Sequence, residues 1–313
     1  MISGMNQILR RIAPFFLYII LLSGISHGSA HAGPQEQGGS VISEQQIRYT
    51  IQDLAAFGTR HAMSAQAGDA ADYLKARLGE IGCPAFDDAF TYRGAAMRNI
   101  VCTLPNSNQQ AARLIILGAH YDSIVDETDD PDAPAPGADD NASGVAATLA
   151  AAAELARTPL PGAEVRIVFF TAEEIGMGGS KHYVNDVLKE EQRPVAAIIT
   201  DYIGTDTGAD GVMLLYDKRS EKLQRRIETC AHGTQPDLHV WSMRSDMLKT
   251  FGDYKAFWDA GRAAVMLVRE FKAGITEYAH TPQDTPDKLR MSQVVKIADL
   301  IYGVVLDLAG PQQ

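Results

Sequence analysis

Three short apolar runs in this chain are each followed directly by acidic or imidazole side chains. The runs cover residues 114–117, 165–171 and 196–200. Continuous apolar runs of this length are typical of the inner strands of a parallel sheet, which are buried on both faces. In open α/β sheets, ligands bind outside the carboxyl ends of the strands, so the polar residues after these runs are candidates for a site.

The side chains at these strand ends are one imidazole and several carboxylates. His120 alone is explained equally well as part of a capped strand end, and the two glutamates alone are better explained as solvated loop residues. Their recurrence indicates a shared site, because parallel strands end at the same edge of a sheet. The candidates are His120 and Asp122 after the first run, Glu173 and Glu174 after the second, and Asp201 after the third, while His280 supplies a second imidazole late in the chain.

Paired aspartates precede an alanine-rich helix predicted over residues 142–157. Asp139, Asp140 and Asn141 stand in sequence just before it. An Asp at this place is usually an N-cap that satisfies free backbone N–H groups. Two adjacent aspartates are less easily explained in this way. We therefore expect one of them to serve the site, opposite His120, while the other or Asn141 caps the helix.

These residue types are the ligands that zinc takes in proteins, namely imidazole nitrogen and carboxylate oxygen. Two histidines, Asp201, one of the paired aspartates and one of the paired glutamates make five candidate ligands, which is more than one tetrahedral zinc needs. Two metals that share one bridging carboxylate would use all five. The remaining glutamate would then be free to act as a base.

The other segments predict an α/β fold with a mixed, mostly parallel sheet. Strands are expected over residues 86–92 and 99–104, so that hairpin-connected strands come first and helix-connected strands afterwards. Ser43 and Gln46 begin a capping-box-like pattern before one helix, and a second helix is expected over residues 65–81.

Composition favours one domain over residues 33–313. The apolar content of 46% suffices for one large core, and no linker rich in Pro, Gly or Ser divides the chain. The 28 basic and 39 acidic residues give a net charge of −11, which argues against nucleic acid as a partner.

The first 32 residues have the pattern of a secretory signal peptide. A basic pair, Arg10 and Arg11, precedes an apolar core over residues 15–22, and Ala30 and Ala32 fit a cleavage site. We expect cleavage after Ala32, a secreted or periplasmic mature protein, and no stable membrane association thereafter.

Three cysteines, Cys83, Cys102 and Cys230, permit one disulfide and leave one thiol over. A bond between Cys83 and Cys102 is possible, but the spacing does not fix the pairing. Buried small hydrophobic residues are an equally good account of all three.

Five blocks of this sequence resemble the secreted co-catalytic zinc aminopeptidases, bacterial leucyl aminopeptidase and aminopeptidase Y among them. The blocks occur in the order of that family, and they are AHYDS at 119–123, PGADDNASG at 136–144, TAEE at 171–174, Asp201, and EYAHTPQDT at 277–285. The resemblance implies a three-layer αβα fold of the zinc-dependent exopeptidase type. It also implies hydrolysis of the amino-terminal bond of peptides with a free amino terminus, by a water that bridges two zinc ions.

Carried over by position, the resemblance assigns a role to each candidate. His120 and Asp201 would bind one zinc, Glu174 and His280 the other, and Asp140 would bridge them. Glu173 takes the place of the general base, and Asp122 that of a carboxylate that orients His120. The resemblance further implies a cis peptide bond between Asp140 and Asn141.

The sequence departs from the family where specificity is concerned. Gly252, Asp253 and Tyr254 stand where relatives often carry Ser-Asp-His, which leaves the preferred amino-terminal residue open. Three alternatives on the same fold are a glutaminyl-peptide cyclotransferase with a single zinc, a carboxypeptidase or dipeptidase, and a non-catalytic binding domain. We expect a monomer.

Overall fold

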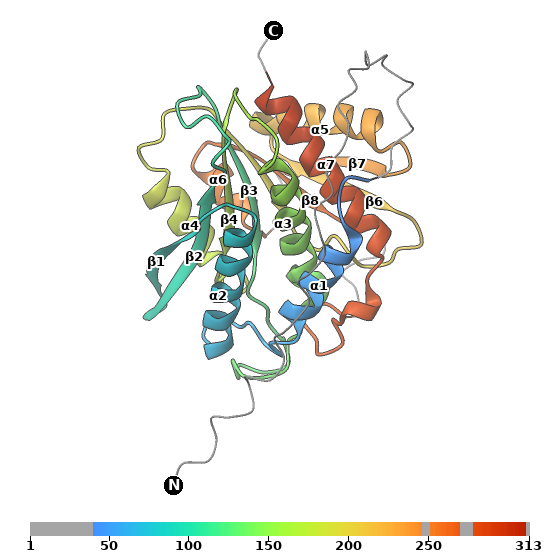
Figure 1. Cartoon of the computed structure of the whole chain (residues 1–313). Helices are drawn as coiled ribbons and strands as arrows, with labels where there is room; N and C mark the ends of the chain where they lie inside the picture. Colours follow the sequence, from blue (N-terminus) through green and yellow to red (C-terminus); the bar gives the residue numbers. More distant parts are fainter. Residues whose placement is uncertain (1–39, 246–250, 270–277, 311–313) are drawn as a thin grey trace, which may run out of the picture. The chain divides into compact units, whose positions relative to one another are not determined.

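Eight strands form one mixed sheet at the centre of the computed structural model, which describes residues 40–245, 251–269 and 278–310 (Figure 1). The predicted signal peptide and its cleavage point lie outside these residues. The strands are β1 (Phe86–Tyr92), β2 (Ala95–Thr103), β3 (Leu114–His120), β4 (Glu164–Phe170), β5 (Val195–Thr200), β6 (Gly211–Tyr216), β7 (His239–Arg244) and β8 (Ala263–Val268), and their order in the sheet is β1-β2-β4-β3-β5-β8-β6-β7.

The middle of the sheet is parallel, as the apolar runs predict. β4, β3, β5 and β8 run side by side in parallel, whereas β1, β2 and β4 pair antiparallel, and β6 lies antiparallel to β8. All residues of β3 are buried. The mixed, mostly parallel sheet of the sequence analysis is therefore confirmed, with the carboxyl ends of β3, β4, β5 and β8 at one edge.

Helices cover both faces of the sheet, which gives three αβα layers (Figure 1). One hydrophobic cluster joins one sheet face to the first group of helices, and a second cluster joins the opposite face to the second group. The first group is α1 (Glu44–Ala55), α2 (Ala65–Glu80), α3 (Gly144–Leu155), α5 (Glu221–Thr234) and α7 (Met291–Ala309). The second is α6 (Tyr254–Asp259) and the short segment η2 (Tyr183–Val187), which directly follows α4 (Gly178–His182). None of the described helices has the length and apolar character needed to cross a membrane.

Two boundaries differ from the sequence prediction in ways that matter for the site. Strand β3 extends beyond the apolar run at 114–117 to His120, which pairs with Phe170 of β4. Gly118 lies within this strand, where a Cβ would stand only 2.7 Å from the Phe170 ring. The alanine-rich helix begins later than predicted, because the turn η1 (Ala138–Ser143) precedes α3.

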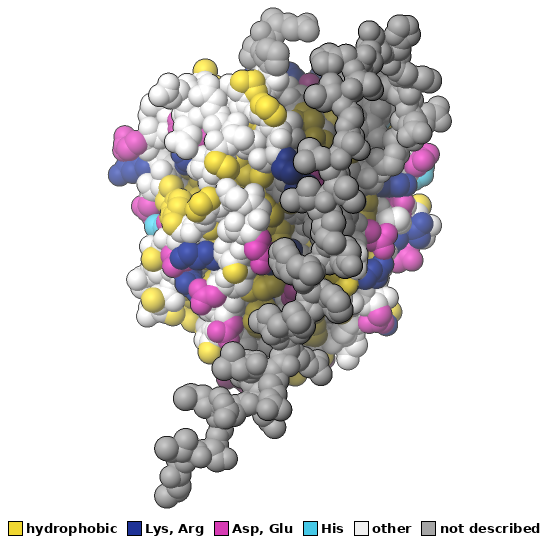
Figure 2. Space-filling model, viewed as in Figure 1, with side chains coloured by type: hydrophobic (Ala, Val, Ile, Leu, Met, Phe, Trp, Pro, Cys, Tyr) yellow, Lys and Arg dark blue, Asp and Glu magenta, His cyan; other side chains and the backbone are white. Residues whose placement is uncertain are grey.

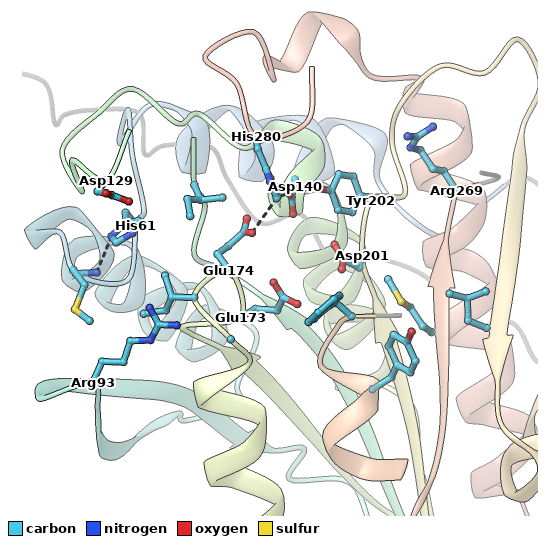
Figure 3. Close-up of a pocket in the computed structure, with 18 of the residues that line it drawn as sticks. His61, Arg93, Asp129, Asp140, Glu173, Glu174, Asp201, Tyr202, Arg269 and His280 are labelled. Atoms are coloured by element: carbon cyan, nitrogen blue, oxygen red, sulfur yellow. Dashed lines mark hydrogen bonds and ion pairs between the residues drawn. The ribbon is translucent and has the colours of Figure 1, made fainter. Parts of the chain in front are cut away.

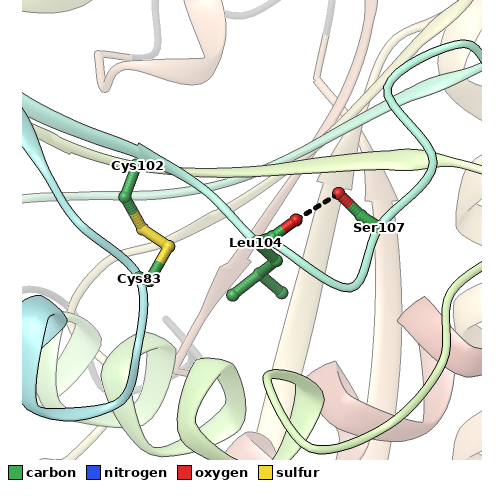
Figure 4. Close-up of a disulfide and its surroundings, with 4 residues drawn as sticks. All are labelled: Cys83, Cys102, Leu104 and Ser107. Atoms are coloured by element: carbon green, nitrogen blue, oxygen red, sulfur yellow. Dashed lines mark hydrogen bonds between the residues drawn. A yellow bond between two sulfur atoms is a disulfide. The ribbon is translucent and has the colours of Figure 1, made fainter.

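A disulfide joins Cys83 to Cys102 and so fixes the segment after α2 to strand β2 (Figure 4). The Cα atoms are 5.9 Å apart, within the usual range for such a bond. Both residues are fully buried, and Cys230 is free. The structure thus settles the pairing that the sequence leaves open.

Loss of this disulfide should lower the free energy of unfolding by about 3 kcal/mol, because it closes a short loop in the unfolded chain. The measurement is urea unfolding of the Cys83→Ala/Cys102→Ala variant beside the oxidised protein. Cys230→Ser is the matched control and should unfold at nearly the same urea concentration as the parent. Equal stability of the parent and the double variant would contradict this role.

Candidate metal centre

Five of the candidate side chains converge at the carboxyl ends of the central strands. They form two groups of potential metal ligands, in each of which the ligand atoms lie within 4.8 Å of one another. The first group is His120, Asp140 and Asp201, and the second is Asp140, Glu174 and His280. Asp140 belongs to both groups, as expected of a bridging carboxylate.

The two oxygens of Asp140 face different imidazoles. Oδ1 lies 3.2 Å from Nε2 of His120, and Oδ2 lies 3.0 Å from Nε2 of His280. Nε2 of His120 is also 3.2 Å from Asp201 Oδ1, and Nε2 of His280 is 3.1 Å from Glu174 Oε2. Each imidazole nitrogen therefore points at one oxygen of the shared aspartate and one oxygen of a second carboxylate.

The donor set fits two cations. Both oxygens of Asp140 and Oε1 of Glu174 are buried and accept no hydrogen bond of good geometry from the described residues. Buried carboxylates are costly unless they are paired or bind a metal. Imidazole nitrogens and carboxylate oxygens gathered around two points are the chemistry that zinc requires.

The pKa shifts in the site also indicate that its carboxylates favour a nearby positive charge. Burial raises the pKa of Glu174 to about 8, and the neighbouring Asp140 carboxylate adds to the rise. Burial lowers the pKa of His280, but contact with Asp140 and Glu174 more than offsets this effect and raises it to about 12. Metal cations in the two groups would neutralise these carboxylates and leave the imidazoles unprotonated as ligands.

Asp122 holds both His120 and the loop that carries the two glutamates. Its Oδ1 lies 3.6 Å from Nδ1 of His120, and its main-chain carbonyl oxygen is 3.2 Å from the same nitrogen. Its carboxylate also accepts the backbone N–H groups of Glu173 and Glu174, both at 3.2 Å. It therefore sets the position of one metal group relative to the loop after β4 that carries the two glutamates.

His280 has a similar partner that the sequence analysis missed. Nδ1 of His280 lies 3.0 Å from Asp126 Oδ1, and the backbone N–H of Asp126 donates to the carbonyl of His280 at 3.1 Å. A carboxylate on the outer nitrogen fixes the ring orientation of a metal-bound histidine. Asp126 lies in an exposed, acid-rich loop, so its sequence context gave no sign of this role.

The turn that presents Asp140 is held by its neighbours. The peptide bond between Asp140 and Asn141 is cis, as the resemblance implies. Asn141 caps α3, since its Oδ1 accepts the Gly144 N–H at 3.0 Å. Asp139 instead accepts the backbone N–H groups of Gly204 and Thr205, in the loop after β5. Asn141, and not Asp139, is therefore the cap.

Asp284 fixes the same turn from the other side. Its two oxygens accept the backbone N–H groups of Asp139 and Asp140, at 2.8 and 3.0 Å. Asp284 belongs to the EYAHTPQDT block, four residues after His280, but the sequence analysis gave it no role. The structure shows that this block supplies both a candidate ligand and the support of the bridging carboxylate.

Arg60 is a fully buried cation beneath the site, and the sequence analysis did not identify it. Its guanidinium donates to the carbonyls of Leu54, Tyr121, Pro136 and Gly137. Burial lowers its pKa to about 10, against the opposing effect of nearby carboxylates, so it is charged at neutral pH. It ties the segments before Asp122 and Asp140 together and offsets part of the negative charge.

Glu173 belongs to neither metal group, although it neighbours Glu174. It lines a cavity of about 1060 Å³, together with Asp140, Glu174, Asp201 and His280 (Figure 3). Burial raises the pKa of Glu173 well above its usual range, and neighbouring carboxylates add to the rise. A carboxylate beside the metal groups but outside them is placed to exchange a proton with a bound substrate.

Comparison with known proteins agrees with this geometry. The sequence profile described as Peptidase family M28 matches residues 99–305. The chain is 28% identical over 302 residues to the "Uncharacterized protein YfbL" of Escherichia coli strain K12, with 86% of both chains covered.

Solved structures with the same fold include enzymes of two kinds. The LapA aminopeptidase of Legionella pneumophila has a TM-score of 0.75 at 20% identity, over 87% of this chain and 73% of that one. BSAP, a zinc aminopeptidase from Bacillus subtilis, has 0.73 at 16% identity, over 87% and 96%. The glutaminyl cyclase of Porphyromonas gingivalis has 0.70 at 19% identity, over 86% and 99%. Identities this low show a common fold.

Proposed function

This chain belongs to peptidase family M28, whose members are zinc-dependent peptidases, and from that premise we propose that it is a two-zinc aminopeptidase. One observation carries the proposal. Two groups of metal ligands share Asp140 beside a free carboxylate, Glu173, in a cavity that is large enough for a peptide end.

The residues assigned to the metals are those of the two groups. His120 and Asp201 would hold one zinc, Glu174 and His280 the other, and Asp140 both. Two zinc ions in such a site would lower the pKa of a bound water, so that it can attack as hydroxide at neutral pH. They would also supply positive charge to the carbonyl oxygen of the substrate.

Glu173 carries the proton in this proposal. Its carboxylate accepts the proton of the attacking water and then returns it to the amine of the departing peptide. The raised pKa of Glu173 suits this exchange, because a general base is most effective when its pKa is close to the working pH. Asp122 accepts the backbone N–H of Glu173 and so fixes the position of this residue in the loop after β4.

The shape of the cavity supports cleavage at the amino terminus. One end is formed by buried side chains of the sheet and α6, namely Leu215, Tyr254 and Met266. An apolar end of this kind suits the side chain of the first residue of a peptide. The free α-amine would lie among the carboxylates of the site, which attract a cation.

Glutaminyl cyclisation is the second candidate, because the Porphyromonas gingivalis enzyme shares the fold. A single zinc would need only one of the two groups. Here the ligand atoms lie within 4.8 Å of one another in both groups, including the first group with His120 and Asp201. The presence of two complete groups favours the two-metal hydrolase. A carboxypeptidase or dipeptidase on the same metals is the remaining alternative.

A panel of aminoacyl p-nitroanilides, their Nα-acetyl derivatives and a glutaminyl peptide tests the proposal. The zinc-loaded protein should hydrolyse free-amine substrates, with the Nα-acetyl derivatives at least about a hundredfold slower, because blocking removes the amine that the site binds. Ammonia release from the glutaminyl peptide without hydrolysis, or cleavage of blocked peptides alone, would overturn the aminopeptidase assignment.

We also propose that the mature protein works outside the cytoplasm as a monomer. The predicted signal peptide supports export. The buried disulfide between Cys83 and Cys102 supports it too, because such bonds persist in oxidising compartments.

A further inference from the structure

We propose that Arg93, in the turn between β1 and β2, binds a substrate carboxylate on the carboxyl side of the cleaved bond. The inference rests on the proposed aminopeptidase function and adds to it a preference for short peptides with a free carboxyl terminus. An acidic side chain near the cleaved bond would offer the same chemistry, and the experiment below separates the two sources.

The cavity has two different ends. Leu215, Tyr254 and Met266 at one end are buried, whereas Arg93 and Met63 at the other are exposed. Figure 3 shows Glu173 and Glu174 between Arg93 on one side and Tyr202 on the other. A peptide whose first residue fills the apolar end must therefore continue past Glu173 towards Arg93.

Arg93 is placed beside the catalytic loop by the residue before it. The hydroxyl of Tyr92 donates to the carbonyls of Ile175 and Gly176, both at 3.4 Å. Gly176 and Gly178 leave room for Tyr92, since a Cβ on either would stand within 2.8 Å of it. The β1–β2 turn is thus packed against the loop that begins with Glu173.

The guanidinium of Arg93 lies close to the Tyr92 ring and to Gly176. Its Cζ lies 5.8 Å from the centre of the Tyr92 ring, a distance at which a cation is attracted to the ring face. One guanidinium nitrogen is 3.8 Å from the point where a Cβ of Gly176 would lie. Arg93 also forms no ion pair with any described residue, so its charge is available to a substrate.

The turn itself is not optimal for an arginine. Arg93 and Gly94 have φ values of 48° and 81°, so both central residues of this two-residue hairpin lie in the left-handed region. Asn-Gly or Asp-Gly is the favoured sequence for such a turn. Asn would suit this turn better than Arg. The presence of an arginine here therefore indicates a role for its side chain outside the hairpin.

His61 supplies a second donor at the same end of the cavity. Its Nδ1 accepts the backbone N–H of Met63 at 3.1 Å (Figure 3). A neutral ring held in this way carries its proton on Nε2. His61 can therefore donate a hydrogen bond from Nε2 to a carboxylate at this end of the cavity. Asp129 also lines this end of the cavity and adds a negative charge there.

The test compares Leu-Gly-Gly with its carboxyl-terminal amide, as the ratio of their kcat/KM values. The parent enzyme should favour the free acid by about tenfold, as expected for one charge-assisted contact at a half-open site. Arg93→Asn should bring the ratio close to one, since Asn keeps the turn and removes the charge. Arg93→Lys should retain part of the preference. Arg225→Gln, an exposed arginine of α5 outside the cavity, is the matched control and should keep the parent ratio.

A third peptide, Leu-Glu-Gly amide, separates the sources of the carboxylate. Faster cleavage of this peptide than of Leu-Gly-Gly amide, lost in Arg93→Asn, would assign Arg93 to an acidic side chain. The same acid-to-amide ratio in the parent and in Arg93→Asn, with no effect of the glutamate, would overturn the subsite. If the parent cleaves no peptide with a free amine, the proposed function itself has failed.

Discussion

Glu173→Gln should lower kcat for aminoacyl amides by about a thousandfold or more while the protein keeps its zinc. The amide has the shape of the carboxylate but cannot accept a proton, and general-base catalysis contributes about 10² to 10⁴ in rate. Because Glu173 lies in neither metal group, its loss should leave both of them intact. Zinc content and kcat of the purified variant are the quantities to measure.

Glu174→Gln is the matched comparison, since the same change is made one residue later. It removes an anionic ligand of the second group, so this variant should bind less zinc than Glu173→Gln. Equal zinc content together with equal residual activity in the two variants would mean that the roles of the neighbouring glutamates are wrongly assigned.

Asp140→Asn should have the largest effect on metal binding. The aspartate gives one oxygen to each group, and an amide is a much poorer ligand that cannot bridge two cations through two oxygens. We expect zinc content after dialysis to fall well below that of the parent, and kcat to fall by at least about a hundredfold.

The control for this variant is Asp130→Asn, the same substitution in the exposed loop before η1. It should keep the zinc content and the kcat of the parent. Retention of two zinc ions by Asp140→Asn would contradict the bridging role, even if activity were lost.

The ends of the central strands could be predicted because two sequence signals coincide there. An apolar run shows where a buried strand lies, and a polar residue directly after it shows where the run leaves the core. His120, Glu173, Glu174 and Asp201 were all found in this way, and the structure brings them to one edge of the sheet. The helix after Asp140 is predictable from its alanine-rich sequence, whereas the choice of Asn141 as its cap comes from the structure.

The supports of the site could not be predicted, because they depend on contacts between distant segments. The Arg60 guanidinium donates hydrogen bonds to the carbonyls of Tyr121 and Pro136, which lie more than 60 residues away in sequence. The residues next to Arg60 in the chain give no indication that it is buried. Asp126 lies in a loop that otherwise looks solvated. The Cys83–Cys102 pairing follows from the packing of α2 on β2, which spacing alone does not determine.

The residues that line the two ends of the cavity could not be predicted from the sequence either. Tyr254 takes the place of a histidine in the family that the sequence resembles, and only the structure shows that it lines the apolar end of the cavity with Leu215 and Met266. Arg93 was overlooked because a surface arginine in a turn is ordinary. Its significance comes from the packing of Tyr92 against Gly176 and Gly178.

Stepwise addition of zinc to the metal-depleted protein tests the central claim most directly, with bound metal and hydrolysis of leucine p-nitroanilide followed together. Two groups that share Asp140 predict two zinc ions bound per chain, with full activity only when the second is bound. Saturation at one zinc per chain, or two bound zinc ions without hydrolysis of any free-amine substrate, would contradict the two-zinc aminopeptidase.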